Sequence, residues 1–149
     1  MLILGCGNPD RGDDAAGPLA ARRLRAMGIA AREHSGDALA LLDDWQGADD
    51  VVVVDAVLTG KRAGAVSVWD ALAALPAPSR LGSSHAFGLA EAVALGRTLG
   101  GLPPRITLYG IEAGRFELGA PPSRAVLRGV ERTARRIYEY CVDQRRPPV

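Results

Sequence analysis

Four consecutive valines, Val51–Val54, are the strongest constraint on the fold of this 149-residue chain. β-branched residues favour extended backbone, and an unbroken apolar run is typical of a strand that is covered on both faces. Such strands occupy the centre of parallel sheets, whose crossover connections are usually helices. The valine run therefore predicts a central parallel strand between two layers of helices.

The rest of the chain alternates short apolar runs with stretches of helical periodicity. Further strands are predicted at 2–6, 29–33, 65–69 and 105–111, and helices at 14–27, 39–45, 88–99 and after Ser123. The serine is a typical N-cap, and the last helix has one apolar stripe: Val126, Val130, Ala134, Ile137 and Cys141. This order predicts an α/β fold, a three-layer α/β/α sandwich with a mostly parallel sheet of about five strands.

Composition narrows the class of protein. The length suits a single domain, predicted at residues 1–144, with 145–149 as a frayed tail. A net charge of +1 gives no strong field for nucleic acid or a membrane surface. Two cysteines, Cys6 and Cys141, form no disulfide framework, and no apolar stretch is long enough for a membrane span. We therefore expect a cytoplasmic monomer.

Polar residues gather where three predicted strands or loops end. Asp14 closes the loop after the first strand, Asp55 follows the valines, and His85 opens the third helix. Because ligands bind at the carboxyl ends of the strands in such sheets, these three side chains are expected to converge. Two carboxylates and one imidazole form a ligand set with open positions, which suits a transition metal such as nickel or zinc.

Each residue also has a simpler interpretation. Asp14 could cap the first helix, Asp55 could accept hydrogen bonds in a turn, and His85 could be a helix-entry residue without a ligand. Their convergence favours the metal site. Asp13 is interpreted as a helix cap rather than a group that supports the metal ligands, and His34 as a surface residue.

Two other chemistries are disfavoured. Gly5-Cys6-Gly7 is similar to the start of a dinucleotide-binding loop, but Asp10 replaces the third glycine, and the acidic loop would repel a pyrophosphate. Cys6 could pair with His85 as a thiol–imidazole nucleophile. Because Cys6 lies inside an apolar run, it is predicted to point into the core instead.

Four segments resemble the hydrogenase maturation protease family. Residues 4–18 are similar to its opening G-N-x-x-x-x-D-D/E-x-x-G signature, and Val54-Asp55-Ala56 to its second motif. Ser84–Glu91 is similar to the third motif, and Tyr109–Glu112 to a lesser fourth segment. The resemblance covers nearly the whole chain, with the motifs in order.

The resemblance implies a nickel-dependent processing reaction. Family members are endopeptidases that remove a C-terminal extension from the large-subunit precursor of nickel–iron hydrogenase, after nickel has been inserted. The family's metal-contacting residues carry over onto Asp14, Asp55 and His85. The nickel would be carried by the substrate, and three ligands should hold free divalent metal only weakly.

This sequence departs from the family's pattern at two places, and both concern the substrate groove. Asp10 stands where the family more often has an apolar residue, and Glu33–Asp37 lacks the family's Asp-Gly-Gly. Two alternative functions remain open at this point. One is a metal-sensing maturation chaperone that cuts nothing, and the other is a small hydrolase that acts on another substrate.

Overall fold

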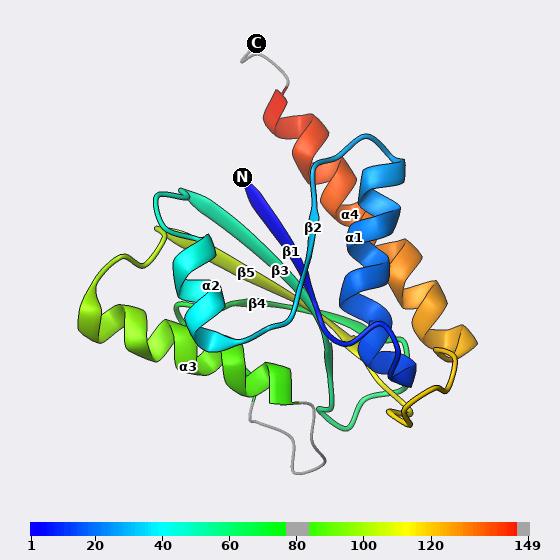
Figure 1. Ribbon diagram of the computed structural model, residues 1–149. Helices are drawn as coiled ribbons and strands as arrows, with labels where there is room; N and C mark the ends of the chain where they lie inside the picture. The colour runs from blue at the N-terminus through cyan, green and yellow to red at the C-terminus, as the bar shows by residue number, and fades with distance from the viewer. Residues whose placement is uncertain (77–83, 146–149) are drawn as a thin grey trace.

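Five strands form one sheet in the order β2-β1-β3-β5-β4 (Figure 1). The computed structural model describes residues 1–76 and 84–145, and side chains are described from Gly88 onward in the second range. All neighbouring strands run parallel except the β4–β5 pair. The strands are β1 Leu2–Cys6, β2 Arg32–His34, β3 Asp50–Val57, β4 Val66–Asp70 and β5 Arg105–Glu112.

Helices cover both faces of this sheet. α1 and α4 pack on one face, whereas α2 and α3 pack on the other (Figure 1). The helical segments are η1 Gly12–Ala15, α1 Ala16–Ala26, α2 Ala38–Asp44, α3 Ser84–Leu99 and α4 Arg124–Arg145. The predicted three-layer α/β/α sandwich with a mostly parallel sheet is confirmed. Arg145 still belongs to α4, and the rest of the predicted tail lies outside the described residues.

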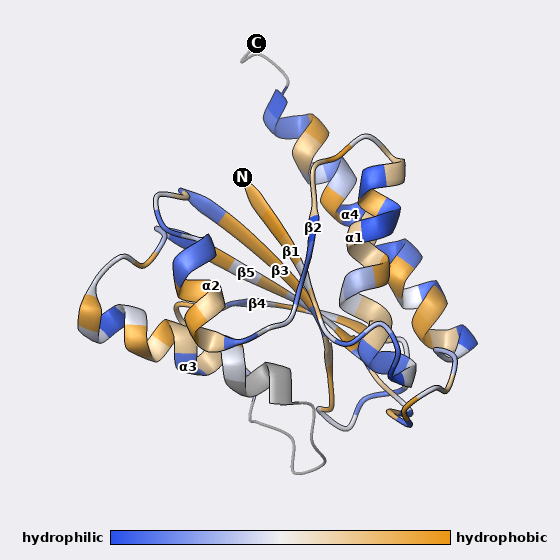
Figure 2. Ribbon diagram, viewed as in Figure 1, coloured by the Kyte–Doolittle hydropathy of each residue, from blue (hydrophilic) through white to orange (hydrophobic). Residues whose placement is uncertain are grey.

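The valine run divides its side chains between two cores. Val52 and Val54 pack with α1 and α4, and Val51 and Val53 pack with α2 and α3. Each of the four is at most 2% exposed. Figure 2 shows these apolar strands between the two helical layers. The burial of alternate residues on opposite faces accounts for the run of four, because neither face of β3 meets water.

Several elements differ from their predicted bounds: β2 begins at Arg32 instead of residue 29, α3 begins at Ser84 instead of residue 88, and two differences lie close to the candidate residues. β3 continues to Val57, so Asp55 lies inside the strand rather than after it. The cause is β5, which pairs with β3 as far as Val57, whereas β1 pairs with β3 only to Val54. The predicted first helix is divided into the 3₁₀ turn η1 and α1, and Gly28, with a φ of 82°, follows its end.

No helix in the described part of the chain is long and apolar enough to cross a membrane.

Candidate active site at the β1–β3 switch point

The chain reverses its direction of winding between β1 and β3. From β1 it passes through α1 to β2, and from β2 it returns through α2, on the opposite face, to β3. In open α/β sheets, ligand sites form at the carboxyl ends of the strands where the winding reverses. The loop after β1 and the end of β3 meet at this point, which places Asp14 and Asp55 at the switch.

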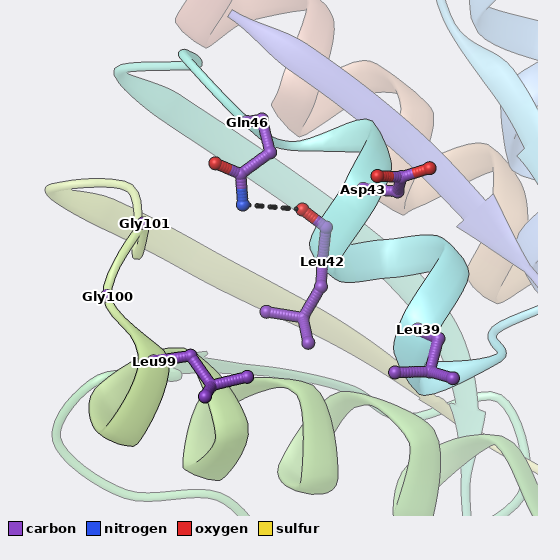
Figure 3. Close-up of a pocket in the computed structure, with 7 residues that line it drawn as sticks. All are labelled: Leu39, Leu42, Asp43, Gln46, Leu99, Gly100 and Gly101. Atoms are coloured by element: carbon purple, nitrogen blue, oxygen red, sulfur yellow. Dashed lines mark hydrogen bonds between the residues drawn. The ribbon is translucent and has the colours of Figure 1, made fainter.

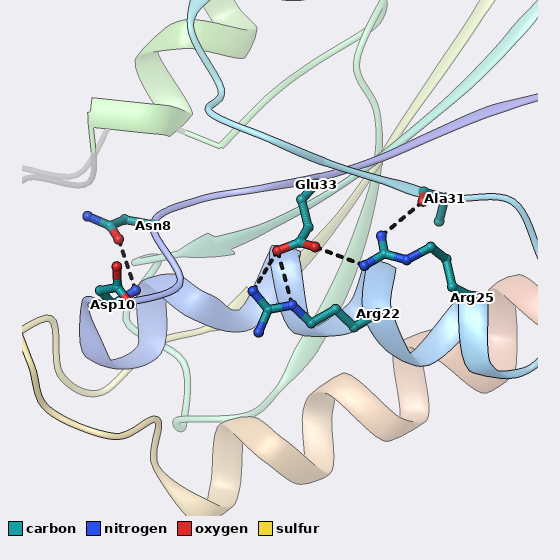
Figure 4. Close-up of polar contacts among 6 residues, drawn as sticks. All are labelled: Asn8, Asp10, Arg22, Arg25, Ala31 and Glu33. Carbon is teal, nitrogen blue, oxygen red and sulfur yellow. Dashed lines mark hydrogen bonds and ion pairs between the residues drawn. The ribbon is translucent and has the colours of Figure 1, made fainter.

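The Asp14 carboxylate is turned back toward the loop that precedes it. The residue is 1% exposed, and its Oδ2 accepts the backbone N–H of Asn8 at 3.0 Å. Asn8 in turn folds the loop, because its Oδ1 accepts the backbone N–H of Asp10 at 2.9 Å (Figure 4). Neither η1 nor α1 has a side-chain cap, so the interpretation of Asp14 as a helix cap is wrong.

Asp55 occupies the stretch of β3 that extends past the end of β1. It is 3% exposed, and its Oδ1 accepts the backbone N–H of Ala56 at 2.8 Å. The carbonyl of Val57 points toward β5, where it accepts the N–H of Ala113. Because successive residues of a strand direct their backbone polar groups to opposite sides, the N–H of Ala56 points toward the β1 side, beyond the last residue of β1 that pairs with β3. Asp55 also lines a small cavity beneath α3 together with Val57 and Leu89.

The thiol of Cys6 is close enough to both carboxylates to be affected by their charge. Burial raises the pKa of its thiol well above the ordinary value, and the negative charges of Asp55 and Asp14 raise this pKa further. The thiol is 1% exposed and belongs to the core on the α2–α3 side. The prediction that Cys6 is a core residue is confirmed, and a protonated thiol is a poor nucleophile. The same location has the negative potential that favours a cation.

His85 lies in the first turn of α3, and its side chain is outside the described residues. The start of α3 is packed against the segment after β2, since a Cβ on Gly88 would overlap the carbonyl oxygen of Gly36. The structure therefore brings Asp14 and Asp55 to one location, while the contribution of His85 stays a prediction. Within residues whose side chains are described, no group of three or more His, Cys, Asp or Glu could hold a metal ion.

Asp13 has a role that the sequence interpretation missed. Its carboxylate is fully buried and accepts hydrogen bonds from three backbone N–H groups: Gly114 at 2.7 Å, Arg115 at 2.9 Å and Ser123 at 2.6 Å. The hydroxyl of Ser123 donates a fourth, at 3.2 Å. Asp13 is thus not a helix cap but ties η1 to the segment between β5 and α4.

Glu112 plays a similar part for the β3–β4 loop. This carboxylate is 2% exposed. Its Oε1 accepts the backbone N–H groups of Thr59 at 2.6 Å and Gly60 at 2.9 Å, and its Oε2 accepts the Thr59 hydroxyl at 2.8 Å. The sequence signal was a single acidic residue at the end of an apolar strand, inside the fourth family-like segment.

His34 is not the surface residue that was predicted. Its side chain is 5% exposed, and its Nδ1 accepts the backbone N–H of Gly36 at 2.8 Å. This acceptor role assigns the proton of the neutral ring to Nε2, which lies 3.0 Å from Asp44 Oδ2. His34 therefore joins the end of β2 to α2.

Close packing of α1 on β1 and β3 depends on Gly17. A Cβ at this position would overlap the carbonyl oxygen of Cys6 and lie 2.6 Å from that of Val54. The helix therefore touches the strands at the level of the switch point. The turn in front of it buries the carboxylates of Asp13 and Asp14, which argues against a pyrophosphate at this helix start.

A second depression lies far from these carboxylates. This groove, of about 600 Å³, separates α2 from the end of α3 (Figure 3). Its lining consists of Leu39, Leu42, Asp43, Gln46, Leu99, Gly100 and Gly101. It contains one carboxylate and no other group suited to acid–base or metal chemistry, so the switch point remains the candidate site.

Comparison with known proteins identifies the family of this chain. The family model described as hydrogenase maturation protease matches residues 36–140. The Escherichia coli hydrogenase maturating endopeptidase HybD has a similar structure (TM-score 0.81, 20% identity, 97% of this chain and 93% of that one). The Thermococcus kodakarensis [NiFe] hydrogenase maturation protease HybD is also similar (TM-score 0.71, 26% identity, 93% of this chain and 97% of that one).

A third solved structure is the [NiFe] hydrogenase maturation protease HycI from Thermococcus kodakarensis. It has a TM-score of 0.66 and 28% identity, over 93% of this chain and 89% of that one. Comparison with curated protein sequences gives no match. Since the family model covers more than two thirds of the residues, the chain belongs to the hydrogenase maturation protease family and is a hydrolase of that class.

Proposed function

We propose that this protein is an endopeptidase that removes the C-terminal extension of a nickel-loaded hydrogenase large-subunit precursor. The observation that carries the proposal is the pair of buried carboxylates, Asp14 and Asp55, at the switch point of a chain of this family. The precursor is the expected partner, and the cytoplasm and a monomeric state are the expected setting.

We assign recognition of the substrate's nickel to Asp14, Asp55 and His85. Carboxylate oxygens and a neutral imidazole are suitable ligands for this metal. α3 carries His85 in its first turn and Leu89 one turn later, and Leu89 lines a cavity together with Asp55. This arrangement supports an imidazole close to the two carboxylates.

The substrate would supply the remaining ligands. A site with three ligands leaves coordination positions open, so we expect free metal to bind weakly and a nickel already held by the precursor to bind well. Burial of Asp14 and Asp55 strengthens their attraction for a cation, because little water screens it. Cleavage would then depend on prior insertion of nickel. When bound, the metal could polarise the scissile carbonyl or activate a water molecule.

Single substitutions test this assignment. Asp14→Asn, Asp55→Asn and His85→Ala should each abolish release of the extension, while circular dichroism and thermal unfolding stay close to those of the parent protein. Asp49→Asn is the control, since this exposed carboxylate lies just before β3, outside the site. Normal cleavage by any of the three variants would remove that residue from the site.

The chaperone alternative predicts a different result with the same reagents. A metal-sensing protein that cuts nothing would form a stable complex with the nickel-loaded precursor, and the extension would stay attached. A hydrolase of another substrate would neither bind nor cleave the precursor.

A further inference from the structure

We propose that a basic surface beside the candidate site binds an acidic segment of the protein substrate; this inference rests on the proposed function. The surface, here called the basic rim, consists of four exposed arginines and two exposed leucines around the start of α4. Its members are Arg62, Arg115, Leu118, Arg124, Leu127 and Arg128.

Three separate segments are held together to form the basic rim. The β3–β4 loop lies against α4, because a Cβ on Gly64 would overlap the carbonyl of Ala125, and Arg132 donates to the Gly64 carbonyl at 2.6 Å. The segment before α4 is tied to η1 by Asp13, which accepts the backbone N–H groups of Arg115 and Ser123. The three segments that carry the arginines therefore lie side by side.

The rim carries an excess of positive charge. The guanidinium groups of Arg62, Arg115, Arg124 and Arg128 form no hydrogen bond or ion pair within the described parts of the chain. Two exposed carboxylates, Asp10 and Glu117, belong to the loops alongside, fewer than the four arginines. The rim therefore attracts anions, although the whole chain has a net charge of only +1.

Charge elsewhere in the protein is arranged differently. Residues 34–60 contain six aspartates and neither lysine nor arginine. Farther along α4, Glu131 pairs with Arg23 at 3.0 Å, and Arg136 lies over the ring of Tyr109. In the described part of the chain, Arg124 and Arg128 near the start of α4 thus lack the partners that Arg23 and Tyr109 provide farther along the helix.

Exposed leucines indicate a protein partner. Leu118 is 77% exposed and Leu127 is 42% exposed. The backbone around Leu118 is fixed, because Gly119 N donates to the Asp10 carbonyl at 2.8 Å and Gly12 N donates to the Ala120 carbonyl at 3.0 Å. A leucine that is held outward among cations can bury its apolar surface against a protein partner. Single-stranded nucleic acid is bound mainly by aromatic stacking, and the rim has no aromatic residue.

The partner follows from continuity with the site. Asp13, which holds two of the rim's segments, is the neighbour of Asp14. Two of the rim's segments therefore begin next to the turn that carries Asp14, within reach of a protein whose metal is bound there. The geometry therefore fits an acidic surface segment of the nickel-loaded precursor, located close to its metal.

The test uses the doubly substituted protein Arg124→Glu/Arg128→Glu, with Arg32→Glu as control. Arg32 is an exposed arginine on β2, outside the rim, and acidic residues at a helix start favour folding of α4. Cleavage of nickel-loaded precursor is followed at low and at moderate salt. We expect the KM of the double variant to rise about tenfold at ~0.05 M salt, with kcat unchanged. The KM of the parent protein should rise with salt, and that of the double variant should not.

The other outcomes are equally defined. If the double variant behaves like Arg32→Glu, the basic rim does not bind substrate, while cleavage by the parent protein keeps the proposed function. If the parent protein does not cleave the precursor, the proposed function fails. The rim is then tested by measuring how tightly the parent protein and the double variant bind the nickel-loaded precursor at low and at moderate salt. Salt-sensitive binding that the double variant loses supports the rim. If the parent protein does not bind the precursor, or if the double variant binds it equally well, the rim proposal is overturned. It is also overturned if the double substitution weakens binding of a short DNA duplex but not of the precursor.

Discussion

Asp13 and Ser123, which are 110 residues apart in the sequence, are joined by two hydrogen bonds. The backbone N–H of Ser123 donates to Asp13 Oδ1 at 2.6 Å, and its hydroxyl donates to Oδ2 at 3.2 Å. The same hydroxyl accepts the N–H of Val126 at 3.3 Å, which makes Ser123 the N-cap of α4. One buried carboxylate thus fixes the start of the last helix relative to the turn that carries Asp14.

Replacing Asp13 should therefore destabilise the protein strongly. Asp13→Ala leaves three backbone N–H groups without an acceptor, and we expect the free energy of unfolding to fall by about 3 kcal/mol or more. Asp13→Asn keeps one acceptor oxygen and should lose less. Urea denaturation measures both. Asp43→Ala, at an exposed carboxylate on α2, should change stability by less than about 0.5 kcal/mol. Equal stability of Asp13→Ala and Asp43→Ala would contradict this account.

A methyl group at position 17 should be poorly tolerated. Because backbone carbonyls of β1 and β3 surround Gly17, Gly17→Ala must push α1 away from the sheet, at an expected cost of about 3 kcal/mol. Gly114→Ala is the matched control, since its added Cβ would meet Ala63 at an ordinary 3.4 Å. Thermal unfolding of the two variants compares them directly. A Gly17→Ala protein as stable as Gly114→Ala would show that this contact is loose.

Much of the fold could be predicted from the sequence. The valines indicated the central strand, and the stripe from Val126 to Cys141 indicated the buried face of α4, whose five members are all buried. These patterns are local and periodic. The length of β3 could not be predicted, because it depends on β5, a strand about 50 residues later.

The site was only partly predictable for a related reason. Asp14 and Asp55 were identified from their predicted places after strands, and both are buried, although Asp55 lies inside β3. The roles of Asp13 and Glu112 depend on backbone donors that are distant in sequence, so no local pattern could reveal them. The burial of His34 depends similarly on α2, which packs beside the end of β2.

Cys6 should be dispensable for cleavage. Burial and the nearby carboxylates raise its thiol pKa, so the thiol stays protonated at neutral pH and is not a nucleophile. We expect Cys6→Ala to process the precursor at the parent rate. In the parent protein, Cys6 should be unreactive toward iodoacetamide while the protein is folded and should react once it is unfolded. A Cys6→Ala protein with normal stability and no activity would restore the thiol as a candidate nucleophile.

The ion pairs of Glu33 should make a small, pH-dependent contribution to stability. Hydrogen bonds from Arg22, and then from Arg25, lower the pKa of this carboxyl (Figure 4). A lowered folded-state pKa gives stability that is present above the unfolded value of about 4.3 and is lost as the pH falls through the folded value.

Glu33→Gln should thus be less stable than the parent protein at pH 7, by less than about 1 kcal/mol because the pairs are exposed. The difference should shrink as the pH falls below about 4. Urea titrations at several pH values measure it, with the exposed Glu139→Gln as control. A difference that grows at acid pH would have the wrong sign for this mechanism.

The most direct test of the central claim compares two forms of one substrate. The large-subunit precursor from the same organism is prepared with and without inserted nickel, each form is mixed with this protein, and the C-terminal extension is followed by mass spectrometry. The account predicts release of the extension only from the nickel-loaded form. Equal release from both forms would contradict recognition of the substrate's nickel by Asp14, Asp55 and His85.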